Sequence, residues 1–197
     1  NPARDVQLCI DLKVNFLGFV FYEKSPLNVL LSDIKMLSNY DKKSSSFVAV
    51  TVNPSNEFIK SNLVGNFDFI QLHGSETRER VAEIKNMGLK TIKAIKVIEE
   101  KDVDSYKDYE GVADLILFDS NSMEKSKSIP RDLLSKIPKG DKFCLAGAID
   151  SKNMPEYSQL GFSFLDLSSG LERENLKGYK DHLKIKNFMN KVNELQN

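Results

Sequence analysis

The sequence predicts an α/β fold in which parallel strands alternate with helices, and three observations lead to this prediction. The chain has 197 residues, a length that suits one domain. Segments with helical spacing separate short apolar runs rich in Val, Ile and Phe, which are typical of strands buried in a parallel sheet. Seven such runs are found, at residues 16–22, 47–52, 67–72, 91–97, 113–118, 142–146 and 162–167.

The helical segments are recognised by their spacing and by their start signals. Asn1-Pro2 is a favourable start for the first of them, and Ser75-Glu76 is expected to open the third. A helix therefore comes before the first predicted strand. The clearest stretches cover residues 3–12, 57–63, 77–87, 151–157 and 180–195.

Seven strands and eight helical stretches together predict a TIM barrel, (β/α)8, whose first strand is missing from the chain as given. We therefore expect a further strand to precede Asn1. A doubly wound open sheet tolerates seven strands and is the alternative. Because no Pro-, Gly- or Ser-rich linker divides the sequence, residues 1–197 are expected to form a single β/α-barrel domain.

The composition argues against several classes of protein. The 28 Lys and Arg residues are balanced by 28 Asp and Glu residues, so neither a nucleic acid nor an anionic membrane is an expected partner. No apolar run approaches the ~20 residues of a membrane span, and no secretory signal opens the sequence. Cys9 and Cys144 are too few for a disulfide framework and lack metal-ligand spacing, so we expect a cytoplasmic protein without a bound metal.

Polar residues follow several of the predicted strands, where β/α barrels carry their chemistry. Asp119 ends the most apolar run. Desolvation raises the pKa of a carboxyl at such a place, and this suits it to act as a general acid near neutral pH; a turn-forming aspartate is the alternative. His73 also follows a strand, as either a catalytic or a structural histidine. Cys9 and Cys144 are predicted to be small core residues.

A phosphate site is predicted at the last two strand ends. Ser168, Ser169 and Gly170 follow the last strand and precede a short helical turn, so that free backbone N–H groups can hold an anion. Gly147 and Ala148 follow the preceding strand, and barrels often build phosphate sites from these two loops. A plain turn is the alternative for the Ser-Ser-Gly segment.

A set of short motifs runs in order through the whole chain. They are LGFVFY and KSP within 17–26, QLHGSE at 71–76, KAIKV at 93–97, LFD at 117–119, LAGAI at 145–149, LDLSSGLE at 165–172 and GYKD at 178–181. Together they resemble the phosphoribosylanthranilate isomerase family, the β/α-barrel enzymes of tryptophan biosynthesis. QLHG and DLSSGLE are specific as a pair.

The resemblance implies conversion of N-(5′-phosphoribosyl)anthranilate into 1-(o-carboxyphenylamino)-1-deoxyribulose 5-phosphate, an Amadori rearrangement without a cofactor. In the family a carboxylic acid protonates the furanose ring oxygen, and a cysteine base then removes the proton from C2′. The acid corresponds to Asp119. This phosphorylated small molecule is the expected partner, and a monomer is favoured. The expected binding residues are His73, Asp166 and Lys24 for the substrate, and Gly147, Ala148, Ser168, Ser169 and Gly170 for its phosphate.

The sequence departs from the family pattern at four places. The family's cysteine base lies in a Lys-Ile-Cys-Gly segment on the first strand, which is not present, and Cys9 aligns within the following helix. Leu27 replaces the Arg expected to hold the anthranilate carboxylate, which leaves Lys24 as the nearest substitute. Residues 120–128 lack the glycines of an expected loop. Ala148 replaces a second glycine, a mild change unless the position needs a positive φ.

These departures leave two other functions open. One is a degenerate, non-catalytic barrel that binds a phosphorylated ligand. The other is a different phosphate-handling barrel enzyme, such as indole-glycerol-phosphate synthase or a ribulose-phosphate epimerase. An epimerase needs several His and Asp metal ligands at strand ends, which His73 does not supply. A synthase needs lysines at particular strand ends, and Lys93 and Lys96 carry no matching motif.

Overall fold

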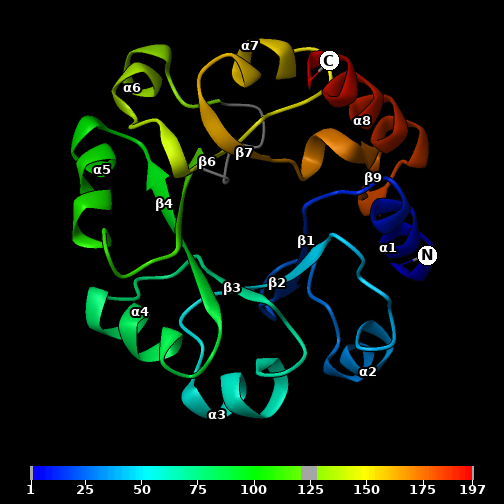
Figure 1. Cartoon of the computed structure of the whole chain (residues 1–197), viewed down its shortest axis with the longest axis vertical. Helices are drawn as coiled ribbons and strands as arrows, with labels where there is room; N and C mark the ends of the chain where they lie inside the picture. The colour runs from blue at the N-terminus through cyan, green and yellow to red at the C-terminus, as the bar shows by residue number, and fades with distance from the viewer. Residues whose placement is uncertain (1, 121–127, 197) are drawn as a thin grey trace. The chain divides into compact units, whose positions relative to one another are not determined.

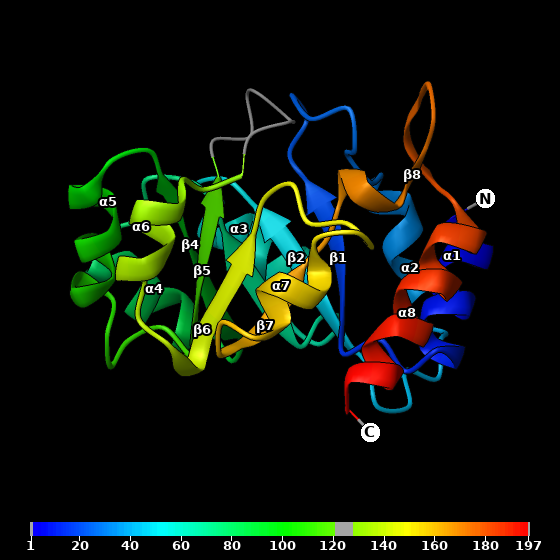
Figure 2. The same ribbon diagram turned by 90° about the horizontal axis from the view of Figure 1, so that it is seen from above.

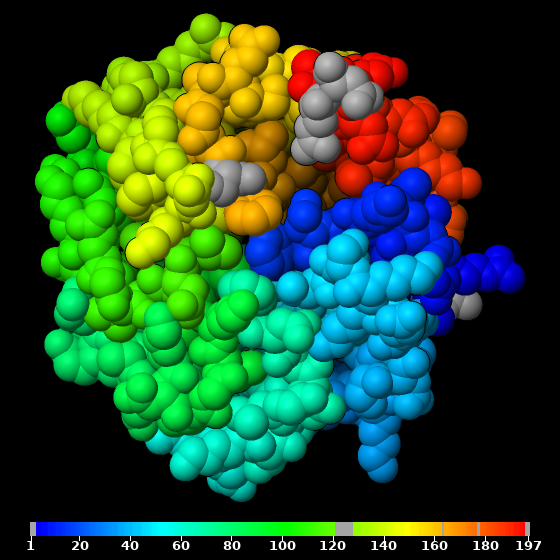
Figure 3. Space-filling model, in the orientation of Figure 1, coloured from blue at the N-terminus to red at the C-terminus, as the bar shows by residue number. Residues whose placement is uncertain are grey.

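The computed structural model describes residues 2–120 and 128–196 and divides the chain into two compact units, Asn1–Ile92 and Lys93–Asn197. Figure 1 colours the first unit from blue to green and the second from green to red. Figure 3 shows the same colours on the packed side chains that cover the ribbons. Strand β4 (Lys90–Val97) contains the boundary between the units.

Strands and helices alternate along the first unit. Its strands are parallel, with β2 between β1 and β3, and α2, α3 and α4 cover their outer side (Figure 1). The elements are α1 (Pro2–Asp11), β1 (Phe16–Phe21), the 3-10 turn η1 (Leu31–Asp33), α2 (Ile34–Leu37), β2 (Ser46–Thr51), α3 (Asn56–Phe58), the π-helical turn η2 (Ile59–Leu63), β3 (Phe69–Leu72) and α4 (Arg78–Lys85).

Aromatic side chains fill the core of the first unit. The ring of Phe19 lies 5.0 Å from that of Phe47 and 6.0 Å from that of Phe67, centroid to centroid. Phe16 meets Phe69 edge to face at 5.1 Å. Such pairs add to the stabilisation that comes from burying apolar surface. The apolar run at 16–21 therefore forms a strand whose Leu17, Phe19 and Phe21 are buried in this core.

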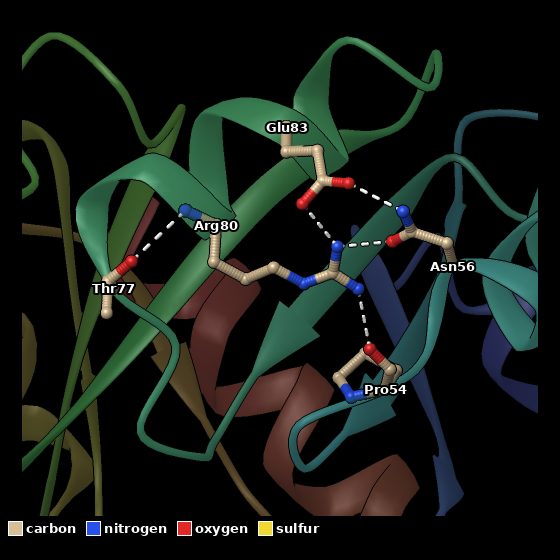
Figure 4. A network of polar contacts seen from close by, with 5 residues as sticks. All are labelled: Pro54, Asn56, Thr77, Arg80 and Glu83. Carbon is tan, nitrogen blue, oxygen red and sulfur yellow. Dashed lines mark hydrogen bonds and ion pairs between the residues drawn. The ribbon is translucent and has the colours of Figure 1, made fainter.

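A polar network fixes the start of α4 to the loop that follows β2 (Figure 4). Thr77 caps α4 by accepting the N–H of Arg80 at 3.3 Å. The Arg80 guanidinium donates to the Pro54 carbonyl at 2.7 Å and also to Asn56 and Glu83. Asn56 in turn donates to Glu83 at 2.5 Å. The planar guanidinium thus holds α4 against α3 and against the loop that follows β2.

The second unit continues the alternation of strands and helices. Strand β6 lies between β5 and β7 and is parallel to both, and Figure 2 shows the arrows of β5 and β6 pointing the same way. The elements are α5 (Glu100–Asp104), the 3-10 turn η3 (Ser105–Asp108), β5 (Leu115–Ser120), α6 (Arg131–Lys136), β6 (Gly140–Ala146), α7 (Met154–Ser158), β7 (Phe162–Asp166), the 3-10 turn η4 (Ser169–Leu171), the antiparallel pair β8 (Glu172–Arg173) and β9 (Leu176–Lys180), and α8 (His182–Gln196).

An aromatic cluster also packs within the second unit. The Tyr106 ring lies 6.2 Å from Phe118 on β5 and 5.5 Å from Phe143 on β6. Phe118 is fully buried, and Leu145 and Met154 are 1% exposed. Strand β5 is therefore anchored by its apolar residues, which fixes the polar residues at its end.

Each predicted strand corresponds to one of β1 to β7, but some boundaries are corrected. The strand predicted over 113–118 is Leu115–Ser120, so Asp119 lies inside it. The helix predicted from residue 180 begins at His182, because the preceding residues form the β8–β9 hairpin. Its two short strands are too brief to show an alternating pattern in the sequence. Ser75-Glu76 does not open α4, because Thr77 is the residue that caps it.

None of the helices in the described ranges is long and apolar enough to cross a membrane. The loop after Asp119, where the sequence lacks the expected glycines, falls at residues 121–127, outside the described residues.

Candidate active site

Two carboxylates stand at the carboxyl ends of strands in the second unit. Asp119 is the penultimate residue of β5, and Asp166 is the last residue of β7. Strand β6 separates these strands, and its Ala146 is the register partner of Asp166. Since the carboxyl ends of parallel strands meet at one edge, both acids lie at the edge where chemistry was expected.

The environment of Asp119 suits a general acid. Desolvation raises the pKa of its carboxyl to about 7, and the negative charge of Asp166 adds to this rise. The backbone N–H of Ser120 and the ammonium of Lys96 act in the opposite direction. A carboxyl with this pKa is protonated in a large fraction of molecules at neutral pH and can donate its proton. The predicted desolvation of Asp119 is confirmed.

Asp166 also has a raised pKa. Desolvation is the main cause, and Lys180 and the backbone N–H of Leu167 oppose it. Asp166 as a whole residue is exposed, although the packing around its carboxyl is dense enough to desolvate that group. The two acids therefore differ in their surroundings, because only Asp166 has Lys180 beside it. An acid pair with different environments is a common basis for two different roles in one site.

Gly147 allows the loop after β6 to lie directly against the end of β5. A Cβ built on Gly147 would stand 2.1 Å from the Ser120 hydroxyl oxygen and 3.0 Å from the Ser120 nitrogen. Its φ is +102°, a conformation that side-chain-bearing residues rarely adopt. Glycine is therefore needed here for space and for backbone conformation alike, and it brings the loop beside Asp119.

Ala148 also has a positive φ, of +49°. Its replacement of glycine is therefore not the mild change that the sequence suggested, because the left-handed region costs an L-residue roughly 1–2 kcal/mol. The loop is held in this shape by Asn153, whose amide donates to the Ala148 carbonyl at 2.8 Å and accepts the N–H of Asp150 at 2.9 Å. In the part of the chain that the structure describes, the N–H groups of Gly147 and Ala148 have no protein acceptor.

The loop after β7 lies against the loop after β6. A Cβ on Gly170 would stand 2.3 Å from the Ile149 carbonyl oxygen and 3.3 Å from the Cα of Asp150. A short helical turn is present, as the sequence predicted, but it is the 3-10 turn η4 at Ser169–Leu171, so Ser169 and Gly170 lie inside the turn and not before it. No side chain caps the start of this turn. The structure thus brings Gly147 and Ala148 next to the turn at 168–170, which is the pair of loops expected to bind phosphate.

The β8–β9 hairpin adds a cation to these loops. The Lys180 ammonium donates to the Ser168 carbonyl at 2.9 Å and lies 3.9 Å from the Glu172 carboxylate. Sequence reasoning missed Lys180, because it was read as part of the last helix. It also missed Lys96, which acts on Asp119. The signal for Lys180 was its place in the GYKD motif.

His73 lies in the first unit, directly after β3. Its Nε2 is 2.6 Å from the Gln71 amide nitrogen, and its backbone N–H donates to the Thr51 carbonyl at 2.9 Å. This contact fixes the ring of His73 beside the Gln71 amide. The His73 side chain is exposed, whereas Gln71 is 9% exposed. The histidine thus lies next to Gln71 at the end of β3, with an exposed side chain.

Glu76, the last residue of the QLHGSE motif, binds the backbone of the loops that follow β2 and β3. Its buried carboxylate accepts the N–H of Asn53 at 2.8 Å and the N–H of Gly74 at 3.2 Å. Asn53 has a φ of +47°, and its side-chain oxygen accepts the N–H of Ser75 at 3.0 Å. A Cβ on Gly74 would stand 2.4 Å from that same oxygen. The ends of β2 and β3 are therefore clamped together by their own side chains.

Lys24 lies in the loop after β1, with an exposed side chain. This loop is closed by Asn28, whose side-chain oxygen accepts the N–H of Tyr22 at 2.8 Å. Ser25 accepts the N–H of Leu27 at 3.2 Å. Lys24 and His73 belong to the first unit, so their roles in substrate binding stay predictions.

Cys144 does not have the surroundings of a catalytic base. Cys144 is 4% exposed within β6, and its pKa is raised to about 12 by desolvation and by the charge of Asp166. Cys9 lies half-buried in α1. A base needs a thiolate at working pH, and a buried thiol of raised pKa does not provide one. The described residues contain no group of three or more His, Cys, Asp and Glu placed to hold a metal ion.

Comparisons of the whole chain with known proteins agree on one family. The family described as N-(5'phosphoribosyl)anthranilate (PRA) isomerase matches residues 1–191. The N-(5'-phosphoribosyl)anthranilate isomerase of Caulobacter vibrioides is 34% identical over 205 residues, covering 98% of this chain and 92% of that protein. That of Agrobacterium fabrum is 33% identical over 189 residues, covering 90% and 84%.

A solved structure agrees over most of the chain. The phosphoribosyl anthranilate isomerase of Thermotoga maritima shares 26% identity and a TM-score of 0.84, covering 97% of this chain and 94% of that one. Matches of this extent show both the family and its TIM-barrel fold. The chain belongs to the N-(5′-phosphoribosyl)anthranilate isomerase family of tryptophan biosynthesis.

Proposed function

We propose that the strand ends of the second unit supply the acid and the phosphate site of the isomerase reaction, with Asp119 as the general acid. The observation that carries the proposal is the pKa of about 7 that desolvation and Asp166 give to Asp119. A general acid works best when its pKa lies near the working pH, because it is then both protonated and able to release the proton.

In this proposal Asp119 donates its proton to the furanose ring oxygen of N-(5′-phosphoribosyl)anthranilate. The bond between that oxygen and C1′ breaks, and the anthranilate nitrogen supplies the electrons that form a Schiff base. The family's cysteine base then takes the C2′ proton, which gives an enolamine. The enolamine gains a proton at C1′ and loses the proton of its C2′ hydroxyl, and so becomes the ketone product. The sequence of steps is the one that the family resemblance implies. What this chain adds is an acid held partly away from water at the end of β5.

The substrate phosphate is assigned to the loops after β6 and β7. Gly147 and Ala148 leave their N–H groups without a protein acceptor in the described residues, and the start of η4 has no side-chain cap. Backbone N–H groups that converge in this way hold anions well. A related structure, 25% identical with a TM-score of 0.80, is a phosphoribosyl anthranilate isomerase in complex with reduced 1-(o-carboxyphenylamino)-1-deoxyribulose 5-phosphate, and it supports a phosphorylated small-molecule ligand.

Asp166, His73 and Lys24 are assigned to the rest of the substrate. Asp166 is exposed beside Asp119 and can accept hydrogen bonds from sugar hydroxyls. His73 offers an imidazole that can hydrogen-bond to the substrate, and Lys24 offers a cation for the anthranilate carboxylate in place of Arg. The base is assigned to neither Cys9 nor Cys144, so replacing Cys144 with Ser is expected to leave turnover intact.

We also propose a cytoplasmic monomer. Neither Cys9 nor Cys144 forms a disulfide within the described residues, which suits a reducing compartment. Sedimentation of the purified protein measures its oligomeric state directly.

The test is kinetic and compares Asp119→Asn with Asp141→Asn. Asp141 is an exposed aspartate at the start of β6, so its variant controls for a loss of charge in the same unit. Asp119→Asn is expected to lower kcat by ~10²-fold or more, the usual effect of losing an acid–base catalyst, while Asp141→Asn turns over normally. Near-normal kcat in Asp119→Asn contradicts the proposal.

The pH profile provides a second reading of the same proposal. Since the acid must be protonated, kcat/KM of the wild-type protein should fall as pH rises through about 7. Replacing Asp166 with Asn removes the charge that raises this pKa, so the fall should move to lower pH. A protein that binds phosphate but shows no turnover would instead support the non-catalytic barrel, the function that Leu27 favours.

A further inference from the structure

The β8–β9 hairpin places a buried acid and a lysine opposite each other. Glu172 and Lys180 are register partners in the antiparallel pair. The Glu172 side chain is 8% exposed, and its Oε1 has no hydrogen-bond partner in the described residues. The Lys180 Nζ lies 3.9 Å from this atom, and its side chain is 28% exposed. A carboxylate in such a place is stabilised only by a nearby positive charge.

The Lys180 ammonium faces the phosphate loop and the acids together. It donates to the Ser168 carbonyl at 2.9 Å, immediately before η4. Its charge also acts on Asp166, as described above. This bond joins the hairpin to a residue outside it and is not needed to pair β8 with β9. The arrangement instead joins three parts of the site through one side chain.

We propose that Lys180 is a positioning residue of the isomerase: anchored by Glu172, its ammonium fixes the turn at 168–170 for the substrate phosphate and provides the positive charge that faces Asp166. The inference rests on the proposed phosphate site and extends it. Lys180 acts through the Ser168 carbonyl and through Asp166. Its charge favours the carboxylate form of Asp166, and that carboxylate in turn favours the protonated form of Asp119.

Several groups in the described part of the second unit interact electrostatically with the Asp166 carboxyl. Asp119 faces it from β5, Cys144 from β6 and Lys180 from β9, and its own loop contributes the N–H of Leu167. Lys180 is the cation among these groups. Loss of Lys180 should therefore raise the pKa of Asp166, so that a higher pH is needed to ionise it.

Lys184 offers a matched control for Lys180. Its ammonium donates to the Glu172 carbonyl at 2.9 Å, the same kind of bond at the same length, and it lies close by at the start of α8. Lys180→Met and Lys184→Met therefore each remove one hydrogen bond from an ammonium to a backbone carbonyl. Only the first removes the charge beside Asp166 and the bond to Ser168.

The experiment measures KM, kcat and the pH dependence of kcat/KM for the wild-type protein and both variants, with N-(5′-phosphoribosyl)anthranilate as substrate. Lys180→Met is expected to raise KM by about tenfold or more, the loss that follows removal of a hydrogen bond from a charged group. At low pH, kcat/KM should fall as Asp166 takes up its proton. Lys180→Met should also move this acid-side fall to higher pH. Lys184→Met should leave both as in the wild-type protein.

Each outcome decides the inference. If Lys180→Met and Lys184→Met both keep the wild-type KM and acid-side fall, Lys180 has no positioning role. Should Lys180→Met fail to fold, Glu172→Gln carries the test, because it leaves the lysine and removes its anchoring charge. A rise in KM of threefold or more in that variant supports the inference, and an unchanged KM overturns it. An inactive wild-type protein would refute the proposed function itself, and the inference with it.

Discussion

At the strand ends of the first unit, Glu76 and Asn53 accept the hydrogen bonds of the surrounding backbone. At the strand ends of the second unit, the N–H groups of Gly147 and Ala148 have no acceptor in the described part of the chain. Both places combine a strand end, a close-approaching glycine and a residue of positive φ. They differ in whether the protein's own side chains occupy the polar groups.

The difference teaches how to separate scaffold from site among similar loops. A loop whose donors are already satisfied internally is held rigid and has little left to offer a ligand. A loop with free donors next to acids of raised pKa has unused binding capacity and unusual electrostatics, and both are typical of active sites. By this criterion the ligand-binding loops belong to the second unit. Glu76 instead fixes the backbone at Gly74, next to His73.

The sharpest way to break the comparison is Gly147→Ala. The new Cβ would overlap Ser120, and φ would remain at +102°, so the loop must move. We expect the free energy of unfolding to fall by about 3 kcal/mol, from overpacking together with backbone strain. We also expect KM to rise by at least tenfold, because the N–H groups at 147 and 148 no longer converge with the turn at 168–170. Chemical denaturation and steady-state kinetics measure the two effects.

Gly111→Ala is the control for this variant. Gly111 also has a positive φ, of +76°, but no atom lies within 4 Å of the place that an added Cβ would take. It should lose stability through strain alone and keep its KM. Equal KM values in the two variants would mean that the loop after β6 does not bind the substrate.

The second prediction concerns the clamp in the first unit. Glu76→Ala leaves the N–H groups of Asn53 and Gly74 without this acceptor, and each such loss costs roughly 1–3 kcal/mol when the group is buried. Because these two groups are only partly buried, we expect the unfolding free energy to fall by about 2 kcal/mol. Glu76→Gln keeps an acceptor oxygen and should lose much less. A clamp that only supports the scaffold should leave the pH profile unchanged in both variants.

The sequence predicted most of this arrangement because its signals are local. Buried parallel strands show as apolar runs, and the small residues at 147–148 and 168–170 mark loops where backbone lies close to backbone. The raised pKa of Asp119 was predicted for a physical reason, since the residue follows the apolar part of β5 and desolvation is the main cause of the shift; its role as the acid stays a prediction. These features need only the order of residues and the rule that parallel strands align their ends.

Other features depend on contacts that the order of residues does not reveal. Glu76 was read as a helix start because it stands before a helical stretch, whereas it pairs with Asn53, 23 positions away. Lys180 was read as helical because the hairpin strands are short, and its contact with Ser168 spans 12 positions. The positive φ of Ala148 was hidden because alanine, unlike glycine, gives no signal for it. Side-chain contacts over such separations are decided by tertiary packing, which local patterns do not record.

The smallest expected effect comes from Ala148→Gly, which removes strain from the loop after β6. At a φ of +49° alanine costs roughly 1–2 kcal/mol, while glycine gives back about 0.5–1 kcal/mol through the greater freedom of its unfolded chain. The variant should therefore be more stable by about 0.5–1 kcal/mol, and its KM should stay the same because the N–H group remains. Ala113→Gly, at a buried position without a positive φ, should lose stability instead. If Ala148→Gly were also less stable than the wild-type protein, the strain assigned to this loop would be absent, and Ala148 would be a residue that the loop accommodates without cost.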